Sequence, residues 1–203
     1  MLLLTLFMFL FMHNIPQKLF SKLKLHRLNR RSDLQSRRHF VHGAQLLSQA
    51  RSSSSPADRS SILHQAVAEA DKATALDPRD AAAHILKALI LELQGFNTSA
   101  IDSLDAALSP LAVKSLSDGE RADALCKRAE LRLRLDRVDT AVDDLVESVR
   151  LKREESGRAF RLLGECYEKK GLKEKARKAY EDGLEVQPDF LPARQALDRL
   201  LSS

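Results

Sequence analysis

The sequence predicts an all-α protein built of antiparallel helix pairs that stack on one another. The chain of 203 residues is rich in Ala, Leu, Lys, Arg and Glu, with 30% charged and 5% aromatic residues, a profile typical of helices with wet outer faces. No sustained run alternates in the manner of a strand. Apolar and small residues instead recur with the spacing of one helix face. Two such helices in succession form a pair, and the residue pattern of this pair recurs along the chain.

The clearest helix pair lies between Gly157 and Pro188. Its first apolar stripe ends near Gly171, a residue that can close a helix in the left-handed conformation. A second stripe starts at Leu172 and stops before Pro188, because the residue that precedes a proline disfavours the helical region. One such pair has too little apolar surface to fold alone, so we expect it to stack on further pairs.

The spacing within this pair carries a family resemblance. Its key residues are, in order, Phe160-x-x-Leu163-Gly164-x-x-Tyr167, Gly171, Ala176-x-x-x-Tyr180 and Pro188. This pattern resembles the tetratricopeptide repeat (TPR) family, with Phe in place of Trp and Tyr in place of Phe. The resemblance implies a right-handed superhelical stack in which the first helix of each pair lines a concave groove and a C-terminal helix caps the last pair.

Weaker copies of the same spacing precede this pair. Ala88, Gly95 and Ala100 reproduce the places of Gly164, Gly171 and Ala176, and Asp136 stands at the glycine place of the following copy. Farther upstream we expect a helix over 36–51, a polar loop over 52–61 and a helix over 62–76, closed by Pro78. Ser117 or Asp118 is expected to cap the helix that follows.

These patterns predict three regions. Residues 1–13 form an apolar segment and residues 14–36 a basic linker. Residues 37–203 form the TPR-like domain, with units at about 37–78, 81–114, 122–155 and 157–190 and a cap at 191–203. The net charge of +5 is uneven, because residues 1–38 carry eight Lys or Arg against one Asp. The repeat body is therefore close to neutral, and we expect no nucleic-acid partner.

Three interpretations of the N-terminal region stay open. Residues 1–12 as a helix would span about 18 Å, short of the roughly 30 Å hydrocarbon core of a bilayer. Residues 1–31 could anchor the protein in a membrane or contact an anionic membrane surface. In this interpretation the protein is cytoplasmic and is tethered to the membrane by its N-terminus. The acid-poor basic stretch instead suits a presequence for a chloroplast or mitochondrion. The third interpretation is a functionally silent extension.

The sequence contains no recognisable catalytic or metal-binding pattern. The seven glycines are scattered and form no phosphate-binding loop. His39 and His42 are close together, yet no Cys or carboxylate cluster completes a metal site in the sequence. Cys126 and Cys166 have neither disulfide nor metal spacing. We therefore expect no enzyme activity, no catalytic residue, no cofactor and no bound metal.

The TPR resemblance implies which side chains face the groove. These residues become less apolar along the chain, which suits a helix or extended peptide with an apolar and a charged end. Alternatively, some of the apolar members pack against the N-terminal segment or a neighbouring repeat. The residues expected to contact a partner are Ile85, Leu86, Leu89, Lys127, Glu130, Arg134, Arg158, Arg161 and Glu165.

One TPR subtype binds the acidic tails of heat-shock chaperones through a carboxylate clamp of Lys, Asn and Arg side chains. The second to fourth units place Ile85, Leu89, Lys127, Arg158 and Leu162 at the clamp positions, and the first to third units place Val41, Gln45, Leu86, Asp123 and Lys127 there. Neither set supplies the clamp, so we expect no tight binding of such a tail.

The sequence therefore predicts a non-enzymatic scaffold that binds a protein or peptide of unknown identity in its groove. The alternative is an organelle-targeted assembly or biogenesis factor whose N-terminal presequence is cleaved. An RNA-binding helical repeat is a third hypothesis, against which the near-neutral repeat body counts.

Overall fold

The computed structural model describes the backbone of residues 15–202 and the side chains of residues 32–202. The predicted apolar segment 1–13 lies outside the described residues. The helices are α2 (Ile15–Ser52), α3 (Pro56–Leu76), α4 (Ala81–Leu93), α5 (Asn97–Ala107), α6 (Asp118–Arg134), α7 (Val138–Leu151), α8 (Gly157–Lys169), α9 (Lys173–Val186) and α10 (Leu191–Ser202), with single 3₁₀ turns η1 (Val113–Ser115) and η2 (Arg153–Glu155).

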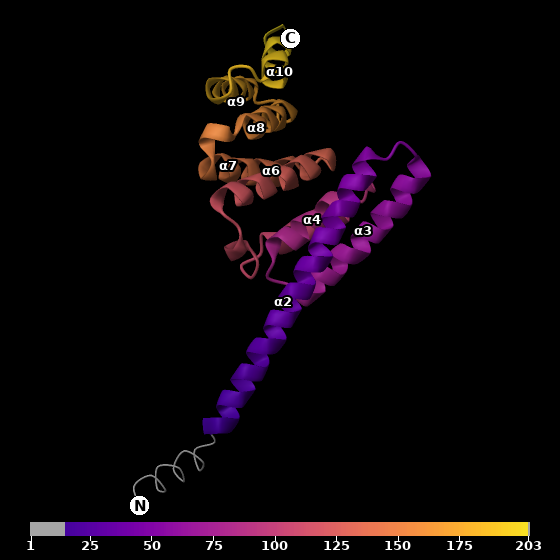
Figure 1. The fold of residues 1–203 in the computed structure, drawn as a ribbon. Helices are drawn as coiled ribbons and strands as arrows, with labels where there is room; N and C mark the ends of the chain where they lie inside the picture. Colours follow the sequence, from indigo (N-terminus) through magenta and orange to yellow (C-terminus); the bar gives the residue numbers. More distant parts are fainter. Residues whose placement is uncertain (1–14, 203) are drawn as a thin grey trace, which may run out of the picture.

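The helices stack as pairs along one direction (Figure 1). Helix α2 packs against α3, α4 against α5, α6 against α7 and α8 against α9, and each pair contacts the next through the second helix of one and the first of the other. Helix α10 packs on α9 and α8 and covers the last pair. The predicted fold class, a right-handed superhelical stack of TPR-like helix pairs with a C-terminal capping helix, is confirmed.

The first pair differs from the sequence prediction in two places. The expected basic linker belongs to α2, which begins at Ile15 because Pro16 lies in the first turn, where a proline is tolerated. The expected polar loop shrinks to residues 53–55. Helix α3 starts at Pro56 because the Ser55 side chain accepts a hydrogen bond from the Asp58 backbone N–H and caps the helix. The prediction of a ten-residue loop was therefore wrong.

Two serine side chains of α2 hold this helix to α3. The Ser32 hydroxyl donates to the backbone oxygen of Leu76 at 2.9 Å, and the Ser36 hydroxyl donates to that of Ala73 at 3.0 Å. Ala73 and Ser36 are both buried. Since Leu76 is the last residue of α3, the part of α2 before Ser32 extends beyond its partner helix, and Figure 1 shows it projecting from the stack.

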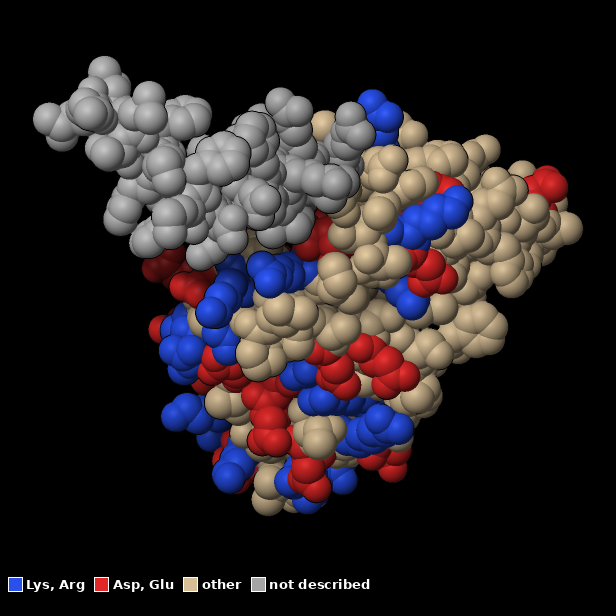
Figure 2. All heavy atoms as spheres, turned by 90° about the horizontal axis from the view of Figure 1, so that it is seen from below, with Lys and Arg blue, Asp and Glu red and all other residues tan. Residues whose placement is uncertain are grey.

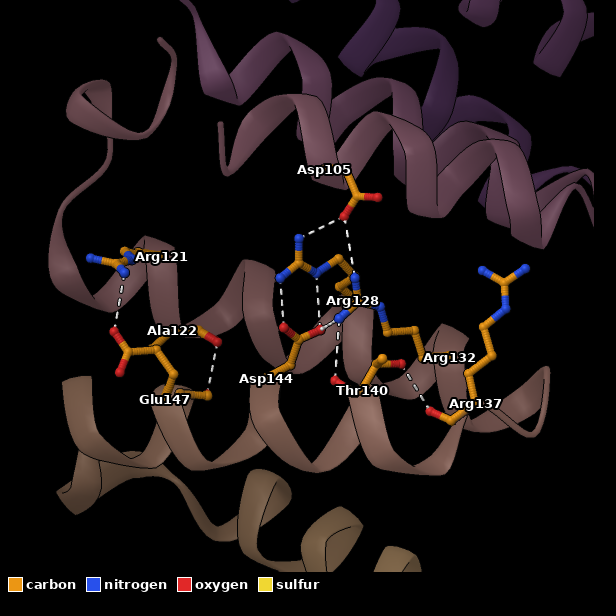
Figure 3. Close-up of polar contacts among 10 residues, drawn as sticks. Asp105, Arg121, Ala122, Arg128, Arg132, Arg137, Thr140, Asp144 and Glu147 are labelled. Carbon is orange, nitrogen blue, oxygen red and sulfur yellow. Dashed lines mark hydrogen bonds and ion pairs between the residues drawn. The ribbon is translucent and has the colours of Figure 1, made fainter. Parts of the chain in front are cut away.

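The second and third pairs are joined by a cluster of charged side chains (Figure 3). Asp144 of α7 is 4% exposed and accepts two hydrogen bonds from the Arg128 guanidinium, at 2.5 and 2.9 Å. Arg132 donates to the same carboxylate at 2.8 Å, and Arg128 also reaches Asp105 of α5 at 2.6 Å. A buried carboxylate requires such partners. Arg132, which stands at the tyrosine place of the repeat, thus ties its own pair together.

Ser117 caps α6, as the sequence predicts. Its side chain accepts from the Glu120 backbone N–H, while the Glu120 carboxylate accepts from the Ser117 backbone N–H at 2.8 Å. These two bonds form a capping box. The hydrogen bonds from Ser117 also hold the pKa of the Glu120 carboxyl below its usual value. The cap fixes where α6, and with it one wall of the groove described below, begins.

The turns inside the three later pairs share one backbone conformation. Gly95 and Gly171 have φ of +84° and +70°, which confirms the predicted left-handed end of α8, and Asp136 takes the same conformation with φ of +57°. The left-handed conformation is unfavourable by roughly 1–2 kcal/mol for a residue with a side chain, whereas glycine adopts it without this cost. Asp136 is thus a strained member of a series otherwise filled by glycine.

Replacing Asp136 by glycine should stabilise the protein. We expect Asp136→Gly to raise the free energy of unfolding by about 1 kcal/mol, because relief of the backbone strain exceeds the larger entropy that glycine gives the unfolded chain. The lost ion pair with Lys169 is exposed and adds little. Urea denaturation measures the difference, with Asp136→Ala as the matched control that removes the ion pair but keeps the strain. A lower stability of Asp136→Gly than of Asp136→Ala would contradict this account.

Candidate functional site

A cavity of about 620 Å³ opens between α2, α4, α6 and the start of α8. We call this cavity the groove. Its size falls in the range of 300–1,000 Å³ that is typical of ligand sites in proteins. The apolar residues that line it are Phe40, Ala82, Ile85, Leu86, Leu89, Leu116, Ala122, Ala124, Cys126 and Ala159, and the charged ones are Glu120, Asp123, Lys127, Lys152, Glu155 and Arg158.

Helix α4 supplies the apolar wall of the groove. The Asp80 side chain caps the helix by accepting from the Ala82 backbone N–H at 3.0 Å. Ala82, Ile85 and Leu89 then follow at helical spacing on one face; Ala82 is exposed, and Ile85 and Leu89 are half-buried. Leu86 is 5% exposed and packs toward Gly43 of α2. Ile85 and Leu89 are therefore available to a partner, whereas Leu86 belongs mainly to the core.

Two apolar residues that line the groove, Phe40 and Leu116, are absent from the set predicted from the sequence. Phe40 comes from α2 and, like Leu89, packs against the buried cluster formed by the first pair and α4. Leu116 comes from the connection after η1, which packs on Ala81 and Ile85 of α4. The repeat pattern reveals neither residue, because Phe40 stands at a place of its helix that is not expected to face the groove and Leu116 belongs to a connection outside the helix pairs.

The predicted polar residues of the groove form an ion network with one another. Glu130 of α6 lies 3.1 Å from Lys127 and 3.0 Å from Arg134, and it also pairs with Arg158 of α8. Glu92 of α4 lies 3.2 Å from Lys127 and 2.9 Å from Arg134. Burial raises the pKa of the Glu130 carboxyl, but Lys127, Arg158 and Arg134 outweigh it and the net shift is downward.

This network leaves little net charge for a ligand to meet. Lys127 and Arg158 line the groove, yet both cations already pair with Glu130. On the face shown in Figure 2, Lys and Arg side chains are likewise interspersed with Asp and Glu and do not gather by sign. The groove consequently offers an apolar wall beside charges that neutralise each other.

Two of the predicted groove residues lie elsewhere. Arg161 and Glu165 of α8 pair with each other at 3.0 Å and line a separate cavity with Tyr180 and Arg199. Of the remaining predicted residues, Ile85, Leu86, Leu89, Lys127 and Arg158 line the groove, and Glu130 and Arg134 contact it through the ion network. Nothing in the repeat spacing distinguishes the two cavities, because α8 borders both.

The groove contains one thiol, that of Cys126. Burial raises its pKa to about 11, although the positive charge of Arg158 acts in the opposite direction. Burial likewise raises the pKa of Cys166 to about 11. Both side chains are buried and free of disulfides. A thiol must ionise to act as a nucleophile, so neither residue is set up for that chemistry at neutral pH.

The two histidines that the sequence brings together meet a carboxylate from α3. The Nδ1 atoms of His39 and His42 lie 2.6 and 3.3 Å from Oε2 of Glu69, and Lys72 lies 2.7 Å from Oε1. The hydrogen bonds from His39 and then Lys72 lower the pKa of Glu69 to about 2. Lys72 competes with any cation for this carboxylate, and within residues 32–202 no group of His, Cys, Asp and Glu is arranged to hold a metal ion.

A model of the tetratricopeptide repeat matches residues 63–113 and 126–192, which is more than half of the sequence. The chain belongs to the tetratricopeptide repeat family. Proteins of this family are in general interaction scaffolds without catalytic activity. No curated protein matches the sequence.

Solved structures of TPR proteins share the fold. MamA is 18% identical with a TM-score of 0.68, over 83% of this chain and 81% of MamA. PilF of Pseudomonas aeruginosa is 20% identical with a TM-score of 0.66, over 84% of this chain and 69% of its own. The first TPR domain of Spaghetti (RPAP3), bound to the HSP90 peptide SRMEEVD, is 25% identical with a TM-score of 0.54, over 63% of this chain and 97% of its own.

Proposed function

We propose that this TPR protein is a non-enzymatic scaffold that binds an apolar segment of a partner protein in the groove. The observation that carries the proposal is the strip of Phe40, Ile85, Leu89 and Leu116, which is only half-buried and borders a cavity of about 620 Å³. Apolar side chains on one face of a helix or extended peptide would bury this strip. Each fully buried large apolar side chain contributes roughly 1.5–3 kcal/mol.

The charges around the strip favour a partner of low net charge. Lys127, Arg134 and Arg158 already have Glu92 and Glu130 as partners. A strongly acidic or basic ligand would have to break these pairs, and a carboxylate left unpaired in a partly buried site is costly. We therefore expect charge to contribute selectivity at the edge of the groove and apolar contact to contribute most of the affinity.

The proposed location is the cytoplasm, with residues 1–31 as a membrane contact. Within residues 15–202 no helix combines the length and apolarity needed to cross a membrane.

The alternative function is an organelle-targeted assembly or biogenesis factor of the chloroplast or mitochondrion. It is supported by the basic composition of residues 14–31, which contain no Asp or Glu. A mature N-terminus between residues 30 and 40 would favour import.

The groove proposal predicts that one charge on the apolar wall abolishes partner binding. Leu89→Asp places a carboxylate in the half-buried strip, and we expect at least about a tenfold loss of affinity, equivalent to 1.4 kcal/mol. Proximity labelling in cells and quantitative pull-down with the full chain would measure the loss. Val146→Asp is the matched control, because Val146 is an apolar residue of α7 that is 50% exposed and does not line the groove.

Leu89→Asp should melt below the wild type, because Leu89 also packs on the buried cluster of the first pair, and circular dichroism would check that both variants remain folded. The proposal fails if Leu89→Asp folds and keeps every partner that the wild type enriches. It also fails if Val146→Asp loses the same partners as Leu89→Asp, since the loss would then not depend on the groove.

Acidic chaperone tails are expected to bind poorly. At the carboxylate-clamp positions of the second to fourth units, Ile85 and Leu89 belong to the apolar wall, and Lys127 and Arg158 belong to the ion network. The remaining position is occupied by Leu162, which is 2% exposed. Titration of the full chain with the peptide SRMEEVD should give a Kd weaker than about 100 μM. The first TPR domain of RPAP3 is the positive control. A Kd in the nanomolar to low micromolar range would overturn this expectation.

A further inference from the structure

We propose that the groove binds residues 1–13 of a second copy of this chain, so that the protein associates with itself from N-terminus to groove. The inference rests on the proposed function, because it names one occupant of the same apolar wall. It starts from two features that otherwise lack a counterpart: the most apolar stretch of the sequence and the half-buried strip of the groove.

The composition of the segment matches the groove wall. Eleven of the first twelve residues, MLLLTLFMFLFM, are apolar. A helix of twelve residues is about 18 Å long, too short for the roughly 30 Å core of a bilayer. The strip offers aromatic and aliphatic partners in Phe40, Ile85, Leu89 and Leu116. Contact between the two apolar surfaces removes both from water, which is the main favourable contribution to association.

The charges agree with this occupant as well. Residues 1–12 carry no charged side chain, so their entry into the groove leaves the pairs around Glu130 intact. Asp123 is an exposed residue of the groove lining, and its carboxylate interacts electrostatically with Lys152 without forming a close ion pair among the described residues. The sequence continues after the apolar segment with Lys18, Lys22 and Lys24. An apolar segment followed by lysines therefore fits an apolar wall with a carboxylate at its edge.

Distance along α2 requires the occupant to come from another copy. Ile15 begins α2, and Phe40 lies 25 residues later at the groove, so the helix separates them by about 37 Å at 1.5 Å per residue. Fourteen residues span at most about 48 Å when fully extended. Reaching back 37 Å would consume all but about three of them. Because the described end of α2 also projects from the stack (Figure 1), a neighbouring copy is the accessible acceptor.

This contact joins two different surfaces and is therefore heterologous. Such contacts add copies in one direction and give open chains unless the rotation closes a ring. The protein should accordingly form oligomers whose size grows with concentration. Occupied grooves would be unavailable to other apolar partners, so self-association and the binding of a partner would compete for the same wall.

The test uses sedimentation velocity of the full chain and two complementary variants. Ala82→Trp fills the groove from an exposed position and leaves the N-terminus intact. A double variant, Leu4→Lys with Phe9→Lys, makes the N-terminal segment charged and leaves the groove intact. We expect the wild type to associate with concentration and each variant to weaken association at least about tenfold. Val146→Trp, a bulky change at an exposed site of α7, should associate like the wild type.

Mixing the two variants distinguishes this contact from aggregation of a sticky segment. In an equimolar mixture, the intact N-terminus of Ala82→Trp can enter the intact groove of the double variant, so dimers should form and growth should stop there. A mixture that stays monomeric would overturn the inference, as would a wild type that is monomeric throughout or an Ala82→Trp variant that assembles normally.

The membrane is the competing occupant of the segment. If the wild type stays monomeric yet co-sediments with vesicles of phosphatidylcholine and phosphatidylserine as strongly as Ala82→Trp does, the segment binds lipid and the inference is wrong. That result leaves the proposed function standing, because loss of partners in Leu89→Asp tests the groove independently of the N-terminus.

Discussion

The close approach of the two helices within each pair is the constraint on which the rest of the structure depends. A Cβ atom on Gly164 would lie 2.6 Å from Cζ of Tyr180, so this place must carry a small residue. Ala88 and Ala129 hold the same place in the two preceding pairs, within the buried clusters that also contain Leu104 and Leu145. Because each pair is narrow, its neighbours can stack on both sides, and α4, α6 and the start of α8 come to border one cavity.

The sequence predicts the features that follow from this repeated approach. The left-handed turn at Gly171, the cap at Ser117 and the stacking of helix pairs all depend on contacts within some 35 residues, and helical spacing reports them. Helical spacing could not predict the length of α2. A proline breaks a helix in its interior but is tolerated in the first turn, where Pro16 lies. Nor could helical spacing predict the Asp144 cluster, in which Arg128, Arg132 and Asp105 meet from three helices.

The candidate site was predictable only in part, for the same reason. Ile85 and Leu89 follow from the repeat pattern, whereas Phe40 and Leu116 reach the groove across the stack. The pattern also places Lys127, Glu130, Arg134 and Arg158 near a ligand, yet the structure pairs them with each other and with Glu92. The charges thus frame the groove, and the half-buried apolar wall is the surface that remains to be covered. This difference changes the expected ligand from a peptide with a charged end to a predominantly apolar one.

The proposed self-association places residues 1–13 of one copy on the α4 wall of the groove of another copy. Methyl NMR of the full chain tests it most directly, with isotope-labelled protein mixed with an unlabelled copy that carries a nitroxide at Leu2→Cys, since both native cysteines are buried. The account predicts selective broadening of the Ile85 and Leu89 methyl signals, while Leu111 and Leu201, which are 54% and 64% exposed, stay sharp. Equal broadening of all exposed leucines, or none at Ile85 and Leu89, would contradict it.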